Sequence, residues 1–299
     1  MQTWTITEPF LPDLRCKLGE GPYYEPTTDS VRFVDIKSNV LHTVHLPSKT
    51  LTSVPASDRI TVTANIAGVD PAETILVGAK YGPGKMNRVT GEITYVAPLT
   101  SERSERLRTN DGAVGPDGRF WLGYMTDFGY GEFQPEGGIV SYAAGKRESH
   151  LSDIPITIPN TIGWSPTLDT MYITHSSART VYTFSYNAAS HTYTDRRIFY
   201  THPSSGGEPD GFRVDSEGNI WHAVYGDGQV LKLSPQGKVV GVVHVPTKNV
   251  TCVQFVGTQL FITTAADEES GNEESRKFGG AVFMVDVGAT GLKPFEYKE

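Results

Sequence analysis

Hydrophobic residues along the chain fall in short runs, and no stretch keeps the 3.6-residue period of an amphipathic helix. Six runs have the alternating or continuous apolar pattern of β-strands. They are bounded by Gly, Pro, Asp and Asn, which form tight turns at low conformational cost. The runs are residues 31–36, 75–80, 119–125, 171–176, 219–226 and 259–265. This pattern predicts an all-β protein.

Each run belongs to a repeating unit, in which a short apolar strand and a turn come before it and another strand follows. The turns are residues 25–30, 70–73, 115–118, 165–169, 215–218 and 256–258. Units of about four strands that recur every roughly 40–50 residues are typical of propeller blades. We therefore predict one domain over residues 1–299, a six-bladed β-propeller with four-stranded antiparallel blades around a central channel. A β-sandwich is the alternative, but no linker or change of composition divides the chain.

Composition supports this prediction and excludes some partners. Charged residues make up only 20% of the chain, beside 31 Gly and 19 Pro, as expected for many tight connections. The net charge is −8 without a Lys/Arg cluster, which argues against nucleic acid as a partner. No apolar run is long enough to span a membrane, and no signal peptide is visible. With only two distant cysteines, Cys16 and Cys252, we expect a cytoplasmic protein with free thiols.

A ring of polar residues emerges when the six units are aligned on their turns. Counting five residues back from the start of each turn reaches Glu20, Asn65, Asn110, Asn160, Asp210 and Thr251. The first strand of each blade lines the channel of a propeller, so equivalent positions surround one axis. Oxygen-bearing side chains, two of them carboxylates, suit a hard cation such as Ca²⁺ or Mg²⁺. No Cys or His belongs to the ring, which disfavours a zinc site of the usual nitrogen and sulfur type.

The same ring has a second interpretation. A propeller channel can be polar and water-filled because the strand ends need hydrogen-bond partners. Asn and Asp at the start of a strand also stabilise turns through their side chains. The alignment by itself therefore leaves both a metal site and a solvated channel open.

Several motifs in order along the chain resemble the senescence-marker-protein/regucalcin/gluconolactonase family. They lie in residues 18–36, 108–125, 159–174, 209–235, 249–265 and 279–298. Among them are L-G-E-G-P at 18–22, R-x-N-D-G at 108–112 and P-D-G at 209–211. The resemblance covers nearly the whole chain and implies a six-bladed propeller with one divalent ion in its channel.

The resemblance also implies a role for individual residues. Glu20, Asn160 and Asp210 would bind the metal, with Ca²⁺ favoured and Zn²⁺, Mg²⁺ or Mn²⁺ as alternatives. Asp210 would act as the catalytic base in addition to binding the ion. Arg108 and Asn110 would face the substrate, with Asn110 near the metal.

A metal held by three side chains leaves positions open for water and substrate. We therefore predict a metal-dependent hydrolase that opens the ester of a small lactone, like a gluconolactonase. The alternatives are a metal-dependent esterase or phosphotriesterase-like hydrolase, and a non-catalytic calcium-binding regulatory propeller. A substrate-facing Arg108 favours hydrolysis, because a binding scaffold does not need it.

The chain departs from the family pattern at three places. Where sugar lactonases carry an acidic residue for substrate hydroxyls, residues 126–133 offer Asp127 as a substrate-binding candidate, or Phe128 in its place. His175 stands where an acid is frequent in the family, and His222 where a small apolar residue is commoner. Each histidine is either a pocket-lining or a structural residue.

Two further aspartates are expected to be structural. Asp111 follows Asn110 in the first strand of its unit and is expected to fix a backbone turn. Asp35 ends an apolar strand and is expected to form hydrogen bonds within its own blade.

Overall fold

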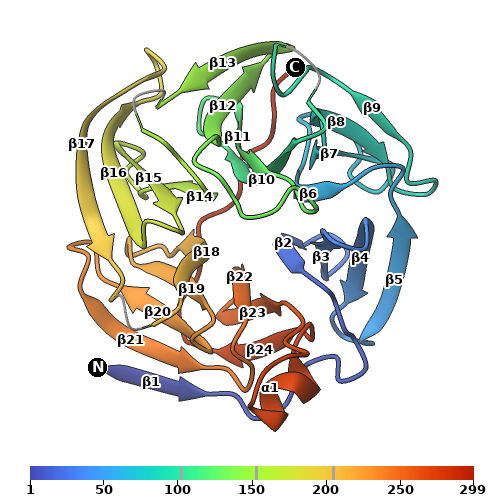
Figure 1. Ribbon diagram of the computed structural model, residues 1–299, viewed down its shortest axis with the longest axis vertical. Helices are drawn as coiled ribbons and strands as arrows, with labels where there is room; N and C mark the ends of the chain where they lie inside the picture. The colour runs from blue at the N-terminus through green and yellow to red at the C-terminus, as the bar shows by residue number, and fades with distance from the viewer. Residues whose placement is uncertain (102–103, 152–153, 204–205) are drawn as a thin grey trace.

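The computed structural model describes residues 1–101, 104–151, 154–203 and 206–299, which form six β-sheets around one axis (Figure 1). Blade 1 contains β2 (Gly19–Glu25), β3 (Ser30–Asp35), β4 (Val40–His45) and β5 (Thr50–Pro55). Blade 2 contains β6 (Ile60–Ala64), β7 (Thr74–Ala79), β8 (Gly82–Asn87) and β9 (Ile93–Tyr95). Blade 3 contains β10 (Leu107–Val114), β11 (Phe120–Thr126), β12 (Gly138–Ala143) and β13 (Lys146–His150).

The remaining three blades complete the ring. Blade 4 contains β14 (Pro159–Trp164), β15 (Thr170–His175), β16 (Thr180–Asn187) and β17 (Thr192–Thr201). Blade 5 contains β18 (Glu208–Val214), β19 (Ile220–Tyr225), β20 (Gln229–Leu233) and β21 (Val239–His244), and β1 (Gln2–Thr5) is added as a fifth strand. Blade 6 contains β22 (Val250–Val256), β23 (Gln259–Thr264) and β24 (Phe283–Asp286).

This architecture confirms the predicted all-β six-bladed propeller, with two departures in strand number. β1 pairs with β21 in parallel, whereas the other strand pairs are antiparallel, and blade 6 has three strands among the described residues. One short helix, α1 (Glu273–Phe278), lies between β23 and β24 and is capped by the Asn272 side chain. No helix in the described part of the chain is long and apolar enough to cross a membrane.

The predicted turns supply the backbone conformations that the hairpins need. In the turn between β10 and β11, Gly118 has φ 84° and donates its N–H to the Gly115 carbonyl oxygen at 2.9 Å. Gly adopts positive φ without steric cost, so it suits this position. Leu168 occupies a comparable turn of blade 4 with φ 59°. This hairpin therefore accommodates a non-glycine residue in the left-handed backbone region.

The hydrophobic core is divided into six clusters, one between each pair of neighbouring blades. Between blades 3 and 4, for example, Trp121 and Ile139 pack with Trp164 and Met171. Between blades 6 and 1, Phe33 packs against Phe261. Each blade therefore buries both of its faces, and these contacts fix its position around the axis.

A β-bulge interrupts the first strand of every blade near its start. The bulges contain Asn110 in blade 3, Asn160 in blade 4, Asp210 in blade 5 and Thr251 in blade 6, and Glu20 directly precedes the bulge of blade 1. Bulges re-aim side chains and are frequent beside functional sites. The ring predicted from the sequence thus coincides with the bulge in four blades, and in blade 1 Glu20 lies one residue before it.

The prediction was wrong for Asn65 in blade 2. Asn65 lies after β6, where its side chain accepts a hydrogen bond from Arg32 at 2.9 Å. The bulged residue of this blade is Thr61, whose hydroxyl lies 2.9 Å from that of Thr109. The connection between β6 and β7 is longer than in the other blades, so counting back from its turn ends past the strand.

The C-terminal segment crosses the face of the ring opposite to these bulges. Gly291 forms a bridge with Asp215 of blade 5, and Tyr297 forms a parallel bridge with Ile66. The Lys298 N–H then donates to the Gly118 carbonyl oxygen at 3.0 Å. Figure 1 shows this tail running from blade 5 to the neighbourhood of blades 2 and 3. We call this side the tail face, and the side where the first strands begin the site face.

Tyr297 should anchor the tail, because its side chain is 1% exposed and packs in the core between blades 2 and 3. Tyr297→Ala is expected to lower the free energy of unfolding by about 3 kcal/mol, the usual cost of truncating a buried aromatic side chain. Urea denaturation measures the change. Lys293→Ala, in an exposed part of the same tail, is the control. Equal unfolding midpoints for the two variants would show that the tail adds no stability.

Candidate metal and substrate site

Glu20 is the contribution of blade 1 to the axis. Its side chain is buried, and its Oε2 accepts the Gly21 N–H at 3.0 Å. Gly21 has φ 55°, a conformation that favours glycine in the bulge. Burial, together with the negative charges of Asp210 and Asp111, raises the pKa of Glu20 well above its ordinary value. Glu20 therefore shares one electrostatic environment with carboxylates of blades 3 and 5.

Asn160 and Asp210 meet across the boundary between blades 4 and 5. The side-chain amide of Asn160 donates to Oδ1 of Asp210 and lies 3.2 Å from the Ser176 hydroxyl. Its own oxygen accepts the Thr161 N–H at 3.0 Å. Burial and the charge of Asp111 raise the pKa of Asp210 well above its ordinary value. Two residues 50 positions apart in the sequence are thus in direct contact.

Asp111 has the structural role expected from the sequence. Its Oδ1 accepts the Gly112 N–H at 2.7 Å, and its Oδ2 accepts the hydroxyl of Thr161 in the next blade. Burial raises the pKa of Asp111, and the nearby Arg213 opposes this shift. Asp111 thereby adds a third carboxylate to the axis.

Three buried carboxylates and one amide around the axis fit a hard divalent cation. Carboxylate and amide oxygens are the donors that Ca²⁺ and Mg²⁺ prefer. The carboxylates raise the pKa values of one another, so a nearby positive charge would relieve their repulsion. Glu20, Asn160 and Asp210 are the members of this group that could hold the ion, and their assignment as ligands stays a prediction.

Arg108 and Asn110 lie beside this group on β10. Nη1 of Arg108 donates to Oδ1 of Asn110 and to the Thr109 carbonyl oxygen, both at 2.8 Å. The Asn110 amide donates to the Pro159 carbonyl oxygen at 2.8 Å, which ties blade 3 to blade 4. Burial lowers the pKa of Arg108 to about 10, so its guanidinium remains charged at neutral pH. The pair is fixed in place next to the axis.

Asp127 follows β11 on the site face, and ion pairs surround it. Its carboxylate contacts Arg59 and Lys80 and lies 3.6 Å from Nε of Arg108. Its Oδ1 also accepts the Phe128 N–H at 2.7 Å. A direct contact of Asp127 with substrate hydroxyls stays a prediction. The observed contacts show that it holds three cationic side chains together.

The two unusual histidines are buried rather than exposed at the rim. Nε2 of His222 donates to the Asp210 carbonyl oxygen at 3.0 Å, and burial lowers the pKa of His222 to about 3. Nε2 of His175 accepts the Thr157 N–H at 3.1 Å, and burial lowers the pKa of His175 too. Both are neutral at pH 7, and His222 supports the backbone of Asp210.

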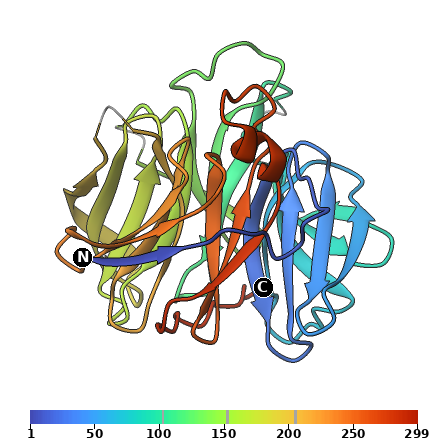
Figure 2. The ribbon, with the colours of Figure 1, turned by 90° about the horizontal axis from the view of Figure 1, so that it is seen from below.

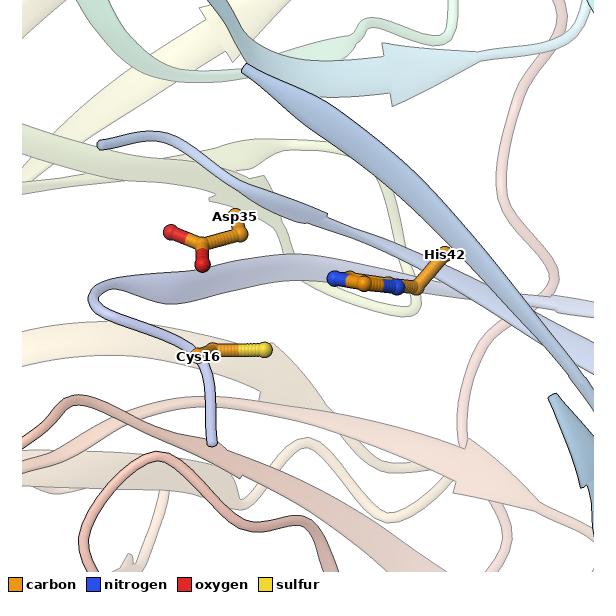
Figure 3. A group of neighbouring side chains, drawn as sticks. All are labelled: Cys16, Asp35 and His42. Atoms are coloured by element: carbon orange, nitrogen blue, oxygen red, sulfur yellow. The ribbon is translucent and has the colours of Figure 1, made fainter. Parts of the chain in front are cut away.

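Among the described residues, Cys16, Asp35 and His42, in and beside blade 1, bring potential metal-ligating atoms within 4.8 Å of one another (Figure 3). Both oxygens of Asp35 already accept backbone hydrogen bonds, from Lys17 at 2.9 Å and from Leu18 at 3.0 Å. Burial also raises the pKa of the Cys16 thiol, which opposes the thiolate that a metal needs. Asp35 therefore has the structural role predicted for it, and this group is poorly suited to a metal ion.

Sequence reasoning missed the cations that face Asp127. Arg59 comes directly before β6, and Lys80 directly after β7, so both lie on the site face with the bulges. They are 68 and 47 residues from Asp127, and no motif joins them. The only indication of this contact in the sequence was that Arg59 and Lys80 lie at strand ends on the site face.

A family model described as SMP-30/Gluconolactonase/LRE-like region matches residues 18–266. Pentonolactonase XacC of Haloferax volcanii is 31% identical over 296 residues, covering 95% of each chain. L-arabinolactonase of Azospirillum brasilense is 30% identical over 256 residues, covering 85% of this chain and 83% of that protein. The structure of a calcium-binding protein, regucalcin, from Agrobacterium tumefaciens superposes with a TM-score of 0.89 at 25% identity, covering 100% of both chains.

The repulsion among the axial carboxylates predicts how stability depends on pH and metal. A carboxyl whose pKa is raised by folding destabilises the folded state increasingly as the pH rises from its unfolded value, about 4, through its folded value. In chelator, Asp210→Asn is therefore expected to unfold at a higher temperature than the wild type, by a margin that grows between pH 5 and 8. Thermal denaturation at several pH values measures this margin.

Divalent metal should reverse that order. Because the ion competes with protons for the carboxylates, Ca²⁺ should stabilise the wild type more as the pH rises, by about 2.7 kcal/mol at a hundredfold excess over its Kd. Asp210→Asn should lose most of this stabilisation. Asp195→Asn, in the exposed outer strand of blade 4, should keep it. A Ca²⁺ effect of equal size in all three proteins would exclude Asp210 as a ligand.

Proposed function

Because the chain belongs to the SMP-30/gluconolactonase/LRE-like family, we propose that it is a lactonase that uses a divalent metal ion to open the ester of a small lactone. Two relatives of 30% identity or more are named as sugar lactonases, and each covers most of this chain. The observation that carries the proposal is the contact between Asn160 and Asp210, whose charge also acts on Glu20, beside the fixed pair Arg108 and Asn110.

Glu20, Asn160 and Asp210 would hold the ion, with Ca²⁺ favoured and Zn²⁺, Mg²⁺ or Mn²⁺ as alternatives. The calcium-binding regucalcin that superposes on the chain supports this choice. When bound, the cation supplies Lewis-acid polarisation of the lactone carbonyl and stabilises the charge that develops on its oxygen.

Asp210 would act as the general base. Its carboxylate takes a proton from water while the water oxygen bonds to the lactone carbonyl carbon. The bond from that carbon to the ring oxygen then breaks, and the proton passes to the departing ring oxygen to give the open hydroxy acid. The hydrogen bond from His222 to the Asp210 carbonyl oxygen supports the backbone of this residue.

Arg108 and Asn110 would orient the lactone. Asn110 already accepts from Arg108 and donates to blade 4, so its amide has little freedom to turn. The Arg108 guanidinium offers a planar set of donors to oxygens of the substrate. Asp127 would act on the substrate through hydroxyl contacts, or indirectly by positioning Arg108. A substrate held in a fixed orientation loses less entropy on the way to the transition state.

A non-catalytic calcium-binding role is the second candidate, because mammalian regucalcins are also similar to the chain, at 27% identity for the bovine protein. The buried Arg108, which lies beside the axis and contacts none of the axial carboxylates, favours catalysis. An esterase or phosphotriesterase-like hydrolase would use the same ion and the same base on a different electrophile. A substrate panel distinguishes these three functions.

Lactone hydrolysis should be measurable as acid release from a panel of aldonolactones and apolar lactones, with and without chelator. We expect turnover of sugar lactones that chelator abolishes and added divalent metal restores. Asp210→Asn should lower kcat by roughly 10²–10⁴-fold, the usual contribution of a general base. Asp195→Asn is the matched control and should retain wild-type activity.

Two results would overturn the proposal in different ways. If no lactone is hydrolysed with any of the four ions while Ca²⁺ still stabilises the fold, the chain is a calcium-binding propeller. If simple esters or phosphotriesters are hydrolysed faster than every lactone, the substrate class is wrong although the metal chemistry stands.

A further inference from the structure

A cluster of positive charge lies on the site face, over blades 1 to 3. Arg59 and Lys80 contact the Asp127 carboxylate, and Nε of Arg108 lies 3.6 Å from it. The three cationic side chains are only 22%, 8% and 3% exposed. Lys37, on the turn after β3, lies nearby, with its Nζ 5.2 Å from the centroid of the Phe128 ring. We call these four residues with Asp127 the cation cluster.

The positive charge of this cluster exceeds its negative charge. Arg59, Lys80 and Arg108 lie around the single carboxylate of Asp127 and are largely removed from water, and Lys37 lies over the Phe128 ring beside them. Lys80 also donates to the Glu105 carbonyl oxygen at 2.6 Å. Asp58, the acid next to Arg59 in the sequence, is bound by the Tyr95 hydroxyl at 2.8 Å and by the Arg59 backbone N–H at 2.7 Å. Glu20 attracts Arg108 from the axis, but it belongs to the carboxylate group there. Burying unbalanced charge is unfavourable unless a counter-charge accompanies it.

Two donors of the cluster make no hydrogen bond. Within the described residues, Nε of Arg59 and Nε of Arg108 are buried without a hydrogen-bond partner, although Nε of Arg108 lies 3.6 Å from the Asp127 carboxylate. Buried donors of this kind are rare in folded proteins and indicate a missing acceptor. Both belong to guanidinium groups, whose paired N–H donors match the oxygens of a carboxylate or phosphate.

Phe128 adds a surface on which these cations gather. The Cζ atoms of Arg108 and Arg59 lie 4.4 Å and 5.2 Å from its ring centroid, and Nζ of Lys37 lies 5.2 Å from it. The ring face attracts cations but carries no net charge, so it does not neutralise them. The Phe128 ring therefore fixes the positions of these cations, and their excess positive charge can still attract an anionic ligand.

We propose that the substrate is an anionic lactone, with a carboxylate or phosphate remote from its ester, and that Arg59, Lys80 and Lys37 bind this group. The inference rests on the proposed lactonase function and specifies its substrate class. Arg108 connects the two parts of the site, since it also holds Asn110 beside the axis. A neutral hydroxyl would accept a hydrogen bond from Arg59 but would leave the charge of the cluster unbalanced.

Three lactones that share one sugar ring test the proposal: a neutral aldonolactone, the same lactone with a terminal carboxylate, and the same lactone with a terminal phosphate. At least one anionic lactone should be hydrolysed with a kcat/KM about tenfold or more above that of the neutral one, as expected for one charge-assisted contact. The two anionic compounds distinguish carboxylate from phosphate. Raising the ionic strength should reduce this preference.

Substitutions in the cluster should change the ratio of anionic to neutral kcat/KM. Arg59→Gln and Lys80→Gln should each lower it about tenfold, and Lys37→Gln, an exposed change that spares the core, should lower it by a smaller factor. Lys146→Gln, in the exposed part of outer strand β13, is the control and should leave the ratio unchanged.

The possible results separate this inference from the proposed function. A wild type that hydrolyses the neutral lactone as fast as both anionic ones overturns the inference and leaves the lactonase intact. A preference for anionic lactones that none of the three cluster variants lowers also overturns it. If none of the lactones is hydrolysed, the proposed function fails and the inference fails with it.

Discussion

Apolar packing between neighbouring blades is the interaction on which the rest of this propeller depends. Every blade is enclosed by two others, so its first strand cannot turn or slide without opening a buried cluster. The same contacts hold the first strands of blades 1, 4 and 5 close to the axis, where Asn160 contacts Asp210 and the charge of Asp210 acts on Glu20. Hydrophobic burial therefore offsets the cost of keeping these like charges together.

The site face combines two regions of opposite charge. Carboxylates surround the axis, whereas cationic side chains gather around Asp127 toward blades 1 to 3. Arg108 lies between them and is bonded to Asn110 on one side and drawn to Asp127 on the other. Figure 2 shows the green segment that follows β11 and the red helix α1 projecting from the same side of the ring. A substrate with an electrophilic head and an acidic tail would match both regions.

Much of the fold could be predicted from the sequence because turn chemistry and strand patterns recur in each blade. The predicted ring position coincides with the bulge in four blades and lies one residue before it in blade 1. The prediction of Asn65 was wrong because it was counted from a turn, and the connection between β6 and β7 is longer than in the other blades. A count from the strand would have reached Thr61. The contacts among Arg59, Lys80 and Asp127 were beyond prediction, because only the packing of blade 3 against blade 2 brings these distant segments together. The parallel pairing of β1 with blade 5 likewise has no local signal.

The two chain ends also determine how the ring would respond to mechanical force. Blades 6 and 1 meet where the chain closes on itself, joined by packing and by contacts such as that from the Thr251 hydroxyl to the Gly19 carbonyl oxygen. Neither end of the chain stops at this junction, because β1 is paired with blade 5 and the C-terminal tail lies across blades 5, 2 and 3. Tension applied to the termini would first have to shear β1 and peel the tail away, so the closure is shielded from pulling.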